Sequence, residues 1–422
     1  MNFNLYGHDD QWLIVDCGIG FEREAAQTRI ITADIGFIAS RRDKLQGLLV
    51  THAHEDHVGA VAFHWPALRC PVYCTRFTAE ILQRKLAEQG LSGRVPLHII
   101  ATGDRHHVGS FEVEWVNITH STPESQALVI RTAAGSVFHT GDWKLDPAPV
   151  VGANYDPVRL QALGEEGMLA MVCDSTNATL DGHSPSEGEL QAGLRQAVQA
   201  APGRVVVACF GSNVARLVTL ARIATAAGRY PGLLGRSLEN YYRAARAAGL
   251  WPSDLELIQS SHLGYLPRDE VFAVATGSQG ESGAALSRLA AGSHPAVELE
   301  RGDTVIFSSR VIPGNEQDLA RLQAGLARQG VNVVLDSTAS SPIHASGHPA
   351  RDELSQMYRW IRPRIAVPVH GEDRHLNAHT ALARALGVPM QLNGRNGDLF
   401  KLAPQPGLRR AAVQTGRIEL RR

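Results

Sequence analysis

The chain has 422 residues, of which 44% are hydrophobic and 20% are charged, and its formal net charge at pH 7 is −1. This length exceeds that of one ordinary domain and predicts two or three domains. The composition is that of a soluble globular protein and excludes a disordered or fibrous chain. The near-zero charge excludes a globally basic surface for nucleic acid, although a local basic cleft remains compatible with it.

The cysteines predict a reducing compartment. There are five of them, an odd number without a CxxC pair, at positions 17, 70, 74, 173 and 209. Four lie in or beside apolar segments, which favours buried reduced thiols and a cytoplasmic protein. The N-terminal segment has no basic and apolar signal pattern, and no apolar run is long enough to span a membrane.

The first predicted elements are two strands joined by a tight turn. Residues 1–6 and 12–17 alternate like strands, and residues 8–10 are typical of a hairpin turn. Residues 45–50 form an apolar run that predicts a buried strand. A helix is expected over residues 78–89, because its apolar spacing is helical and Gly90 is a good C-terminal cap.

Side chains suited to metal binding follow several predicted strands. The strand over residues 45–50 is followed by Thr51-His-Ala-His-Glu-Asp-His57, which contains three histidines and an aspartate. Later apolar strands end at His120, Asp142, Asp174 and His370. Because the carboxyl ends of neighbouring strands meet at one edge of a sheet, we expect these loops to converge.

These ligand types predict a centre for two metal ions. Imidazole nitrogens and carboxylates suit zinc and also manganese. One ion is expected on His52, His54 and His120, and the other on Asp56, His57 and His370, with Asp142 as the bridge. Such a centre lowers the pKa of water and so supplies a hydroxide nucleophile. The chain has neither a G-x-S-x-G motif nor a P-loop.

From about residue 182, strands alternate with Ala-rich helices, which predicts a separate parallel α/β domain. Strands are expected at residues 203–210, 271–277, 303–307 and 332–335, and a helix at residues 187–200. Near the C-terminus, Asn393-Gly394 and Asn396-Gly397 predict a terminal hairpin.

The order of the motifs resembles a known superfamily. His52-x-His54-x-Asp56-His57, followed by His120 and by Asp142 after Thr-Gly, is similar to the ligand pattern of metallo-β-lactamases. Three later segments resemble the extra motifs of the β-CASP nucleases, namely residues 173–178, 344–348 and 368–372. Residues 210–213 and 276–281 are similar to segments of the ribonuclease J family, and the resemblance covers essentially the whole chain in order.

The resemblance implies an α/β fold with an insertion. A four-layer αββα metallo-β-lactamase sandwich is expected at residues 1–181 and 349–422, with a β-CASP α/β domain at residues 182–348. It further implies hydrolysis of RNA with two divalent ions, zinc or manganese. The expected activity is that of a 5′→3′ exonuclease, with endonuclease action in addition.

The resemblance also implies roles for single residues. Asp174 would orient a neighbouring histidine, and His348 would stabilise charge or donate a proton to the leaving oxygen. His370 goes with RNA substrates in this superfamily, whereas DNA-directed relatives carry valine. Asp56 would be a catalytic group as well as a ligand, and Asp16 would support the histidine ligands.

A pocket for a 5′-phosphate is implied at Ser212, His344, Ser346 and Gly347. Small residues with accessible N–H groups and hydroxyls suit a phosphate, so single-stranded RNA with a 5′-monophosphate is the expected partner. From the residues alone, Ser212-Asn213 is equally compatible with a helix N-cap. His344 is equally compatible with an ordinary polar position.

Two segments of the ribonuclease J pattern are missing. The resemblance implies a strand before Asn2 and a C-terminal domain that supports dimers, and the given residues contain neither segment. We therefore expect either a sheet edge without this strand or a misplaced start, and a homodimer that lacks the support of that domain. Three alternatives remain open from the sequence. They are a DNA-directed β-CASP nuclease, a small-molecule thioester or lactam hydrolase, and an RNA-binding protein without catalysis.

Overall fold

The structure, a computed structural model, describes residues 1–24, 27–312 and 314–420 and divides into two compact units. The first unit consists of Met1–Leu145, Ala153–Ser184 and Gly347–Arg422. The second consists of Asp146–Gly152 and Pro185–Ser346. The second unit is therefore inserted into the first, and it includes a short segment that precedes the main insertion.

The first main sheet of the first unit has five strands in the order β1-β2-β5-β6-β7. The predicted N-terminal hairpin is confirmed, because β1 and β2 pair antiparallel and Asp9 and Asp10 form the turn at φ values of 47° and 58°. The strands after β1 run parallel to one another. Their bounds are β1 (Asn4–His8), β2 (Gln11–Val15), β5 (Leu45–Leu49), β6 (Val72–Cys74) and β7 (Leu97–Ile99).

The second main sheet has seven strands in the order β19-β18-β12-β11-β10-β9-β8. Alternate residues of the interior strand β10 point to opposite faces: Leu128 packs with Leu13 of the five-stranded sheet, and Val129 packs against helices. The two sheets therefore pack face to face. The bounds are β8 (Arg105–Val108), β9 (Phe111–Asn117), β10 (Gln126–Thr132), β11 (Gly135–His139), β12 (Ala170–Asp174), β18 (Ile365–Val369) and β19 (Met390–Gln391).

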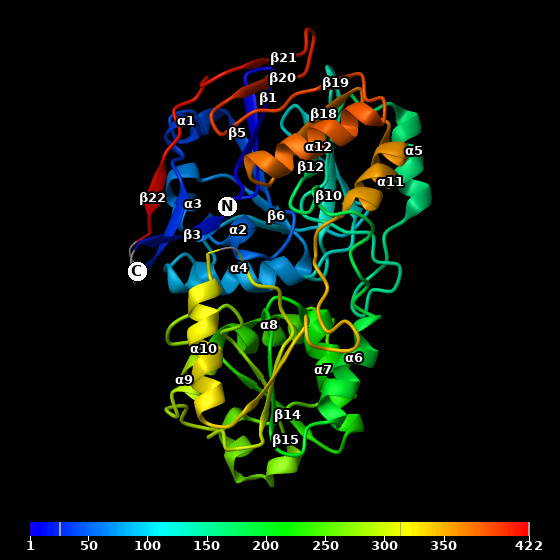
Figure 1. Cartoon of the computed structure of the whole chain (residues 1–422). Coiled ribbons are helices and arrows are strands. Elements are labelled where there is room, and N and C mark those ends of the chain that lie inside the picture. Colours follow the sequence, from blue (N-terminus) through cyan, green and yellow to red (C-terminus); the bar gives the residue numbers. More distant parts are fainter. Residues whose placement is uncertain (25–26, 313, 421–422) are drawn as a thin grey trace. The chain divides into compact units, whose positions relative to one another are not determined.

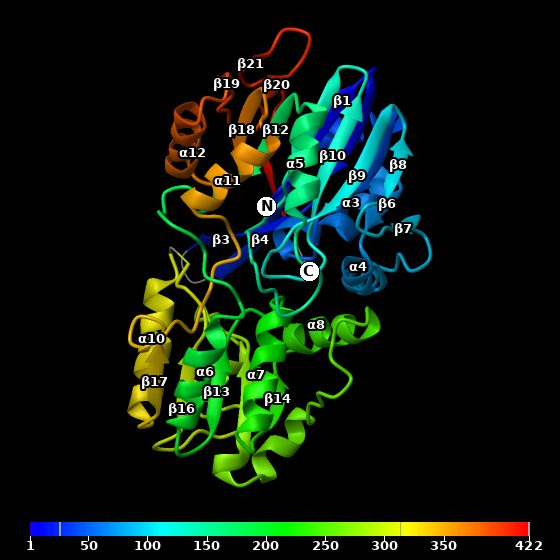
Figure 2. The same cartoon turned by 90° about the vertical axis from the view of Figure 1, so that its right-hand side faces the viewer.

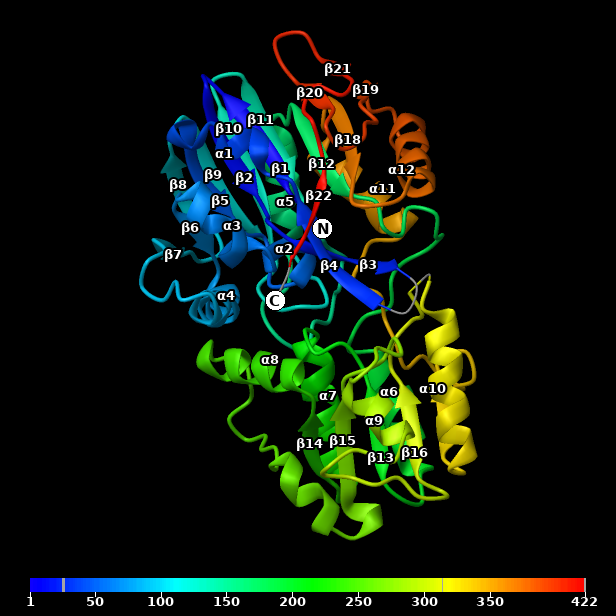
Figure 3. The same cartoon turned by 90° about the vertical axis from the view of Figure 1, so that its left-hand side faces the viewer.

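Helices cover the outer face of each sheet, which confirms the expected αββα order. Helices α5 (Pro157–Glu166), α11 (Arg351–Ile361) and α12 (Asp373–Ala385) share a core with the seven-stranded sheet (Figure 2). The helices beside the five-stranded sheet (Figure 3) are α1 (Gly36–Ala39), α3 (Val61–Leu68) and α4 (Arg76–Glu88), with the short η1 (Arg42–Lys44) and α2 (Glu55–Val58) nearby in the chain. Helix α4 is the helix predicted over residues 78–89, and Gly90 follows it at a φ of 67°.

The predicted terminal hairpin lies later in the chain than expected. The strands β20 (Leu399–Lys401) and β21 (Gly407–Arg409) pair antiparallel, so the turn lies after the Asn-Gly pairs. Asn396 and Gly397 do form a turn, closed by the N–H of Asp398 donating to the carbonyl of Arg395 at 3.0 Å, but this turn leads into β20 and does not join β20 to β21. A Cβ atom on Gly394 would lie 2.4 Å from the Phe400 ring, so this other glycine permits a close contact and does not form the turn. A further sheet contains β3 (Ile19–Glu24), β4 (Gln27–Ala33) and β22 (Arg417–Glu419).

The second unit confirms the predicted parallel α/β pattern. Its five strands are all parallel, in the order β14-β15-β13-β16-β17. They lie in the part of the chain that is coloured green to yellow in Figure 1, where β14 and β15 are labelled. The strands are β13 (Val205–Ala208), β14 (Tyr230–Leu234), β15 (Val271–Ala275), β16 (Thr304–Phe307) and β17 (Asn332–Leu335). The helices are α6 (Leu190–Gln199), α7 (Val214–Ala226), α8 (Arg236–Ala247), η2 (Ser260–Tyr265), η3 (Arg268–Glu270), α9 (Ala285–Ala290) and α10 (Glu316–Arg328).

The first strand of this sheet, β13, lies between β15 and β16. From β13 the chain passes through α7 to one side of the sheet, and from β16 it passes through α10 to the other side. The loops after β13 and β16 therefore lie at a topological switch point, which is where open α/β sheets bind ligands.

All five cysteines are buried free thiols. Within the described part of the chain, every helix is too short or too polar to cross a lipid bilayer.

Candidate metal centre

The residues predicted to bind metal lie on loops that follow strands of the two main sheets. His52 and the residues after it follow β5, His120 follows β9, Asp142 follows β11, and His370 follows β18. Strands β11, β12 and β18 are parallel, so the loops after them lie at one edge of the seven-stranded sheet. The N–H of Gln126 donates to the carbonyl of Thr51 at 3.0 Å and joins the two sheets at this edge.

One group of ligand atoms belongs to His52, His54, His120 and Asp142, and these atoms lie within 4.8 Å of one another. Nδ1 of His54 lies 3.1 Å from Nε2 of His52 and 3.1 Å from Nε2 of His120. Burial lowers the pKa of His54 to about 4, and burial together with the neighbouring imidazoles lowers the pKa of His52 and of His120. Neutral imidazole is the form that binds metal ions.

A second group contains Asp56, His57, Asp142 and His370. Nε2 of His57 lies 3.2 Å from the Asp142 carboxylate, and Nε2 of His370 lies 3.2 Å from the Asp56 carboxylate. Burial opposes protonation of His57, but the charges of Asp142, Asp56 and Asp16 raise its pKa. This side of the centre therefore attracts positive charge. Asp142 belongs to both groups, as expected of a bridging carboxylate.

Hydrogen bonds to backbone and carboxylate oxygens orient two of the imidazoles. Nδ1 of His57 lies 2.7 Å from the carboxylate of Asp16, and Nδ1 of His120 lies 2.6 Å from the carbonyl of Gly347. Because these oxygens only accept, each Nδ1 is the donor and each Nε2 is left as a lone-pair nitrogen that faces the centre. The Asp16 carboxylate also accepts from the N–H of Thr51 at 2.8 Å.

A third group joins Asp142, Asp174, His348 and His370. Nδ1 of His348 lies 2.7 Å from the buried Asp174 carboxylate, and Nδ1 of His370 lies 3.3 Å from the same group. The hydroxyl of Thr176 donates to Asp174 at 2.7 Å. Burial lowers the pKa of His348, but the charge of Asp174 raises it, and the net shift is upward. Asp174 thus contacts two histidines, and the same Nδ1 atoms of His370 and His348 lie 3.4 Å and 3.9 Å from the Asp142 carboxylate.

The donor set fits divalent metal ions. Three neutral imidazoles converge on one side, and two carboxylates with two imidazoles converge on the other. Nδ1 of His54 lies 3.1 Å from two imidazole nitrogens, and neither contact has room for two ring protons, so at least one nitrogen of each contact presents a lone pair. Zinc satisfies such a nitrogen-rich set, and the carboxylate-rich side also suits manganese.

Two residues of the centre have an uncommon backbone conformation. Asp16 has a φ of 64° and His370 a φ of 55°, although neither is a glycine. Positive φ costs a non-glycine residue about 1–3 kcal/mol and is found at functional sites. Asp16 and His370 each lie directly after a strand, and in this conformation the two side chains face the other residues of the centre.

Three residues at the centre were not predicted from the sequence. The side-chain amide of Asn2 donates to Nε2 of His57 at 2.8 Å and to the Asp56 carboxylate at 3.2 Å. No local signal marks Asn2, since its partners lie more than fifty positions along the chain. Thr51 and Thr176 have a weak signal, because each is within two positions of a predicted site residue.

The residues predicted to bind a phosphate lie apart in the chain. Ser212 follows β13 in the second unit, and Asn213 caps α7 by accepting from the N–H of Arg216 at 2.9 Å. The N-cap alternative therefore holds for Asn213. Nδ1 of His344 is buried and has no hydrogen-bond partner among the described residues, and burial lowers its pKa to about 4. Ser346 is half-buried at the end of this unit.

Gly347 belongs to the first unit, where its carbonyl accepts from His120. A Cβ atom at position 347 would lie 2.7 Å from the His120 ring, so a larger residue would displace this imidazole. Gly347 thus contacts a predicted metal ligand, and its part in a phosphate pocket stays a prediction.

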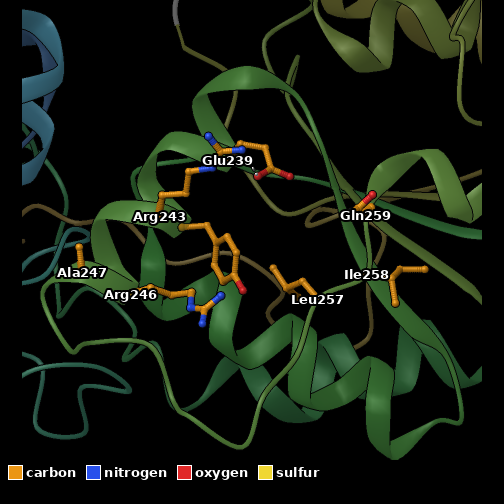
Figure 4. Close-up of a pocket in the computed structure, with 8 residues that line it drawn as sticks. Glu239, Arg243, Arg246, Ala247, Leu257, Ile258 and Gln259 are labelled. Atoms are coloured by element: carbon orange, nitrogen blue, oxygen red, sulfur yellow. Dashed lines mark ion pairs between the residues drawn. The ribbon is translucent and has the colours of Figure 1, made fainter. Parts of the chain in front are cut away.

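A cavity of about 600 Å³ lies on the second unit, away from the predicted site residues (Figure 4). Arg243 and Arg246 of α8 line one side and Gln259 lies on the other. The guanidinium of Arg246 lies 5.8 Å from the Tyr242 ring. None of the predicted metal ligands lines this cavity, so it is not the centre derived above.

Three family models match the chain. The model for "Beta-lactamase superfamily domain" matches residues 11–201, that for "Ribonuclease J, beta-CASP domain" matches residues 202–326, and that for "Zn-dependent metallo-hydrolase RNA specificity domain" matches residues 341–392. The fold is therefore a metallo-β-lactamase domain with an inserted β-CASP domain. The zinc dependence named in the third family model agrees with the nitrogen and oxygen donors that converge at the centre.

Curated relatives named Ribonuclease J are similar over most of the chain. The protein from Sinorhizobium meliloti is 45% identical over 411 residues, which cover 96% of this chain and 72% of the relative. The protein from Mycolicibacterium smegmatis is 39% identical over 92% of this chain and 69% of the relative. The protein from Mycobacterium tuberculosis is 36% identical over 99% of this chain and 75% of the relative. A crystal structure of a protein of unknown function from Enterococcus faecalis shares the fold, with a TM-score of 0.61 at 16% identity, covering 99% of this chain and 96% of that one.

Proposed function

The chain belongs to the ribonuclease J family, and from this membership we infer that it is a metal-dependent ribonuclease that hydrolyses RNA phosphodiester bonds. We propose a 5′→3′ exonuclease that also cuts internal bonds. The observation that carries the inference of a metal-dependent hydrolase is the convergence of the two ligand groups on Asp142, and the direction of cleavage rests on the resemblance to the family. The family decides against the small-molecule hydrolase and the non-catalytic RNA-binding protein.

We propose that His52, His54 and His120 hold one ion and that Asp56, His57 and His370 hold the other, with Asp142 shared. When bound, divalent ions supply charge to the scissile phosphate and lower the pKa of water toward neutrality. The chain's own part is orientation. Asp16 and the Gly347 carbonyl hold the Nδ1 protons of His57 and His120, which keeps their Nε2 lone pairs directed inward.

We propose that His348 holds the proton for the leaving oxygen. Its Nδ1 contacts the Asp174 carboxylate at 2.7 Å, which orients the ring and stabilises the imidazolium form. The raised pKa of His348 favours a protonated ring near neutral pH. Asp56, whose carboxylate lies 3.2 Å from Nε2 of His370, would hold the attacking water in place as well as binding metal.

We propose that Ser212, His344 and Ser346 bind the 5′-monophosphate of single-stranded RNA. Ser212 directly precedes Asn213, the N-cap residue of α7, and the N-terminus of a helix favours an anion. The buried Nδ1 of His344, which lacks a partner in the described part of the chain, would donate to a phosphate oxygen. The loop that carries Ser212 follows β13 at the switch point of the parallel sheet, which supports a ligand site there.

Three further proposals concern organisation. The limits of the inserted β-CASP domain are proposed at residues 182–348, and the pattern of parallel strands supports them. A homodimer is proposed and is tested by light scattering. The cytoplasm is proposed as the site of action, supported by five buried free thiols.

The decisive experiment is a time course on matched end-labelled oligomers after chelation, with zinc or manganese added back. We expect 5′-monophosphorylated RNA to be degraded stepwise from its 5′ end, and a matched DNA to be degraded far more slowly. Random internal cuts without a 5′ dependence would contradict the exonuclease proposal. Equal rates on DNA would contradict the specificity for RNA.

A further inference from the structure

A buried ion pair lies beneath the proposed phosphate pocket. Arg216 in the first turn of α7 and Glu187 ahead of α6 are 1% and 2% exposed. Nη2 of Arg216 donates to Oε1 of Glu187 at 2.8 Å, and Nε donates to Oε2 at 2.9 Å. This is the paired, fork-like geometry that fixes both side chains.

The same guanidinium holds the segment that carries His344. Nη1 of Arg216 donates to the carbonyls of Ser308 at 3.1 Å and of Ile343 at 3.4 Å. The Ser308 hydroxyl also donates to the carbonyl of Ile343, at 2.6 Å. The peptide that joins Ile343 to His344 is therefore tied to α7 through Arg216.

The carboxylate of the pair holds the other side of the pocket. Glu187 accepts from the side-chain amide of Asn213 at 2.9 Å, and Asn213 directly follows Ser212. The backbone N–H of Glu187 donates in turn to Asp146 at 2.9 Å. One ion pair thus connects the turn that contains Ser212 with the segment that contains His344.

Energetics favour a positional role for this pair. Two charges that are almost fully buried lose their hydration, and a pair of apolar side chains of similar volume often stabilises a fold as well. The gain from the pair is a defined geometry, since a guanidinium with five donors can bind a carboxylate and two carbonyls at once. That geometry is located at the carboxyl ends of β13 and β16, where the sheet has its switch point.

We propose that Arg216 and Glu187 are positioning residues that set the spacing between Ser212 and residues 344–346, and thereby determine the preference for a 5′-monophosphate. The inference rests on the proposed function, because it assumes that these residues receive the phosphate. Neither side chain would touch the RNA.

The test compares kcat/KM for two RNAs of the same sequence, one with a 5′-monophosphate and one with a 5′-hydroxyl. In the double variant Glu187→Met/Arg216→Met no buried charge is left alone, so the fold is expected to persist. A misplacement of about 1 Å costs roughly 10²-fold in such a site, so we expect the preference to fall by at least about tenfold. The loss is expected in KM for the phosphorylated RNA, with kcat on the hydroxyl RNA within about twofold of the wild type.

A matched control is the pair of Arg204 and Asp303, which lies at the amino ends of β13 and β16 in the same sheet, with side chains 11% and 0% exposed. Arg204→Met is expected to lower stability and leave the phosphate preference unchanged. If the double variant does not fold, Arg216→Lys replaces it: lysine keeps the charge but lacks the fork, so the preference falls although the fold is kept.

The outcomes are distinguishable. A wild-type enzyme without preference for the monophosphate overturns the proposed pocket, and this inference with it. A wild-type preference that survives in the double variant, or in Arg216→Lys where that variant is used, overturns the inference alone. A preference that also falls in Arg204→Met shows a general loss of stability and overturns it as well.

Discussion

Nδ1 of His348 lies 2.7 Å from the carboxylate of Asp174, although the two residues are 174 positions apart in the chain. Asp174 is 1% exposed, so its charge acts on the imidazole with little screening by water. We expect His348→Ala to lower kcat by about 10²–10⁴-fold, the range for loss of a positioned proton donor. Metal content, measured by atomic emission, is expected to stay at the wild-type level.

The coupling of this pair is tested with Asp174→Asn and the double variant. If Asp174 acts through His348, the second substitution adds little to the first, so the effects on kcat are far from additive. His107→Ala is a suitable control, since that side chain is 80% exposed. Additive losses in kcat would argue that Asp174 acts independently of His348.

Asp142→Ala is expected to remove both activity and metal. The carboxylate belongs to all three groups of converging ligand atoms, so its loss affects every one of them. We expect kcat/KM to fall by at least about 10³-fold, which is about 4 kcal/mol of transition-state stabilisation. Asp43→Ala, at an exposed position in η1, controls for the loss of a carboxylate. Wild-type activity in Asp142→Ala would contradict the proposed two-ion centre.

His379 is expected to make stability depend on pH. It is buried between the Ser175 hydroxyl and the Tyr358 hydroxyl, each 2.8 Å away, and burial lowers its pKa to about 4. The unfolded chain binds a proton near pH 6.5, so the stability from the neutral ring is present above that pH and is lost as the pH falls toward 4. This linkage amounts to about 3 kcal/mol at most.

The measurement is the Tm of the wild type and of His379→Gln between pH 7.5 and pH 5. We expect a lower Tm for the variant at pH 7.5, because it lacks the imidazole that packs between the two hydroxyls. The difference in Tm between the wild type and the variant is expected to narrow as the pH falls. Titration of the other histidines is common to both proteins and cancels in the difference. A difference that is constant with pH would contradict the assignment.

Glu353→Ala is expected to destabilise the first unit. The side chain is buried at the start of α11 and accepts from the N–H groups of Leu145, Ser184 and Ala350, each at 2.8 Å. Its loss leaves one buried and two half-buried N–H donors without this acceptor, at a cost of about 1–3 kcal/mol for each donor that water does not reach. We expect the free energy of unfolding to fall by about 3 kcal/mol or more in urea titrations. Glu165→Ala, with a side chain 75% exposed, should leave it unchanged.

Local patterns were enough to predict most of the elements. The N-terminal hairpin, helix α4 and the parallel strands of the second unit lie where periodicity and turn residues indicated, because these signals depend on near neighbours. The terminal hairpin was misplaced, because Gly394 is required by contact with Phe400 and not by a turn. Contacts of this kind leave no mark in local periodicity.

The sequence by itself determined the class of chemistry. A metal centre is indicated by four ligand residues within residues 52–57 and by His120, Asp142 and His370 at the ends of later strands, before their positions in space are known. Only the tertiary structure decided which atoms meet. It made Asp142 common to every ligand group, directed Nδ1 of His57 to Asp16, and brought Asn2 to the centre. The physical reason is that ligand type is a property of a side chain, whereas distance and orientation depend on sheet order, burial and backbone angles that are set by the whole fold.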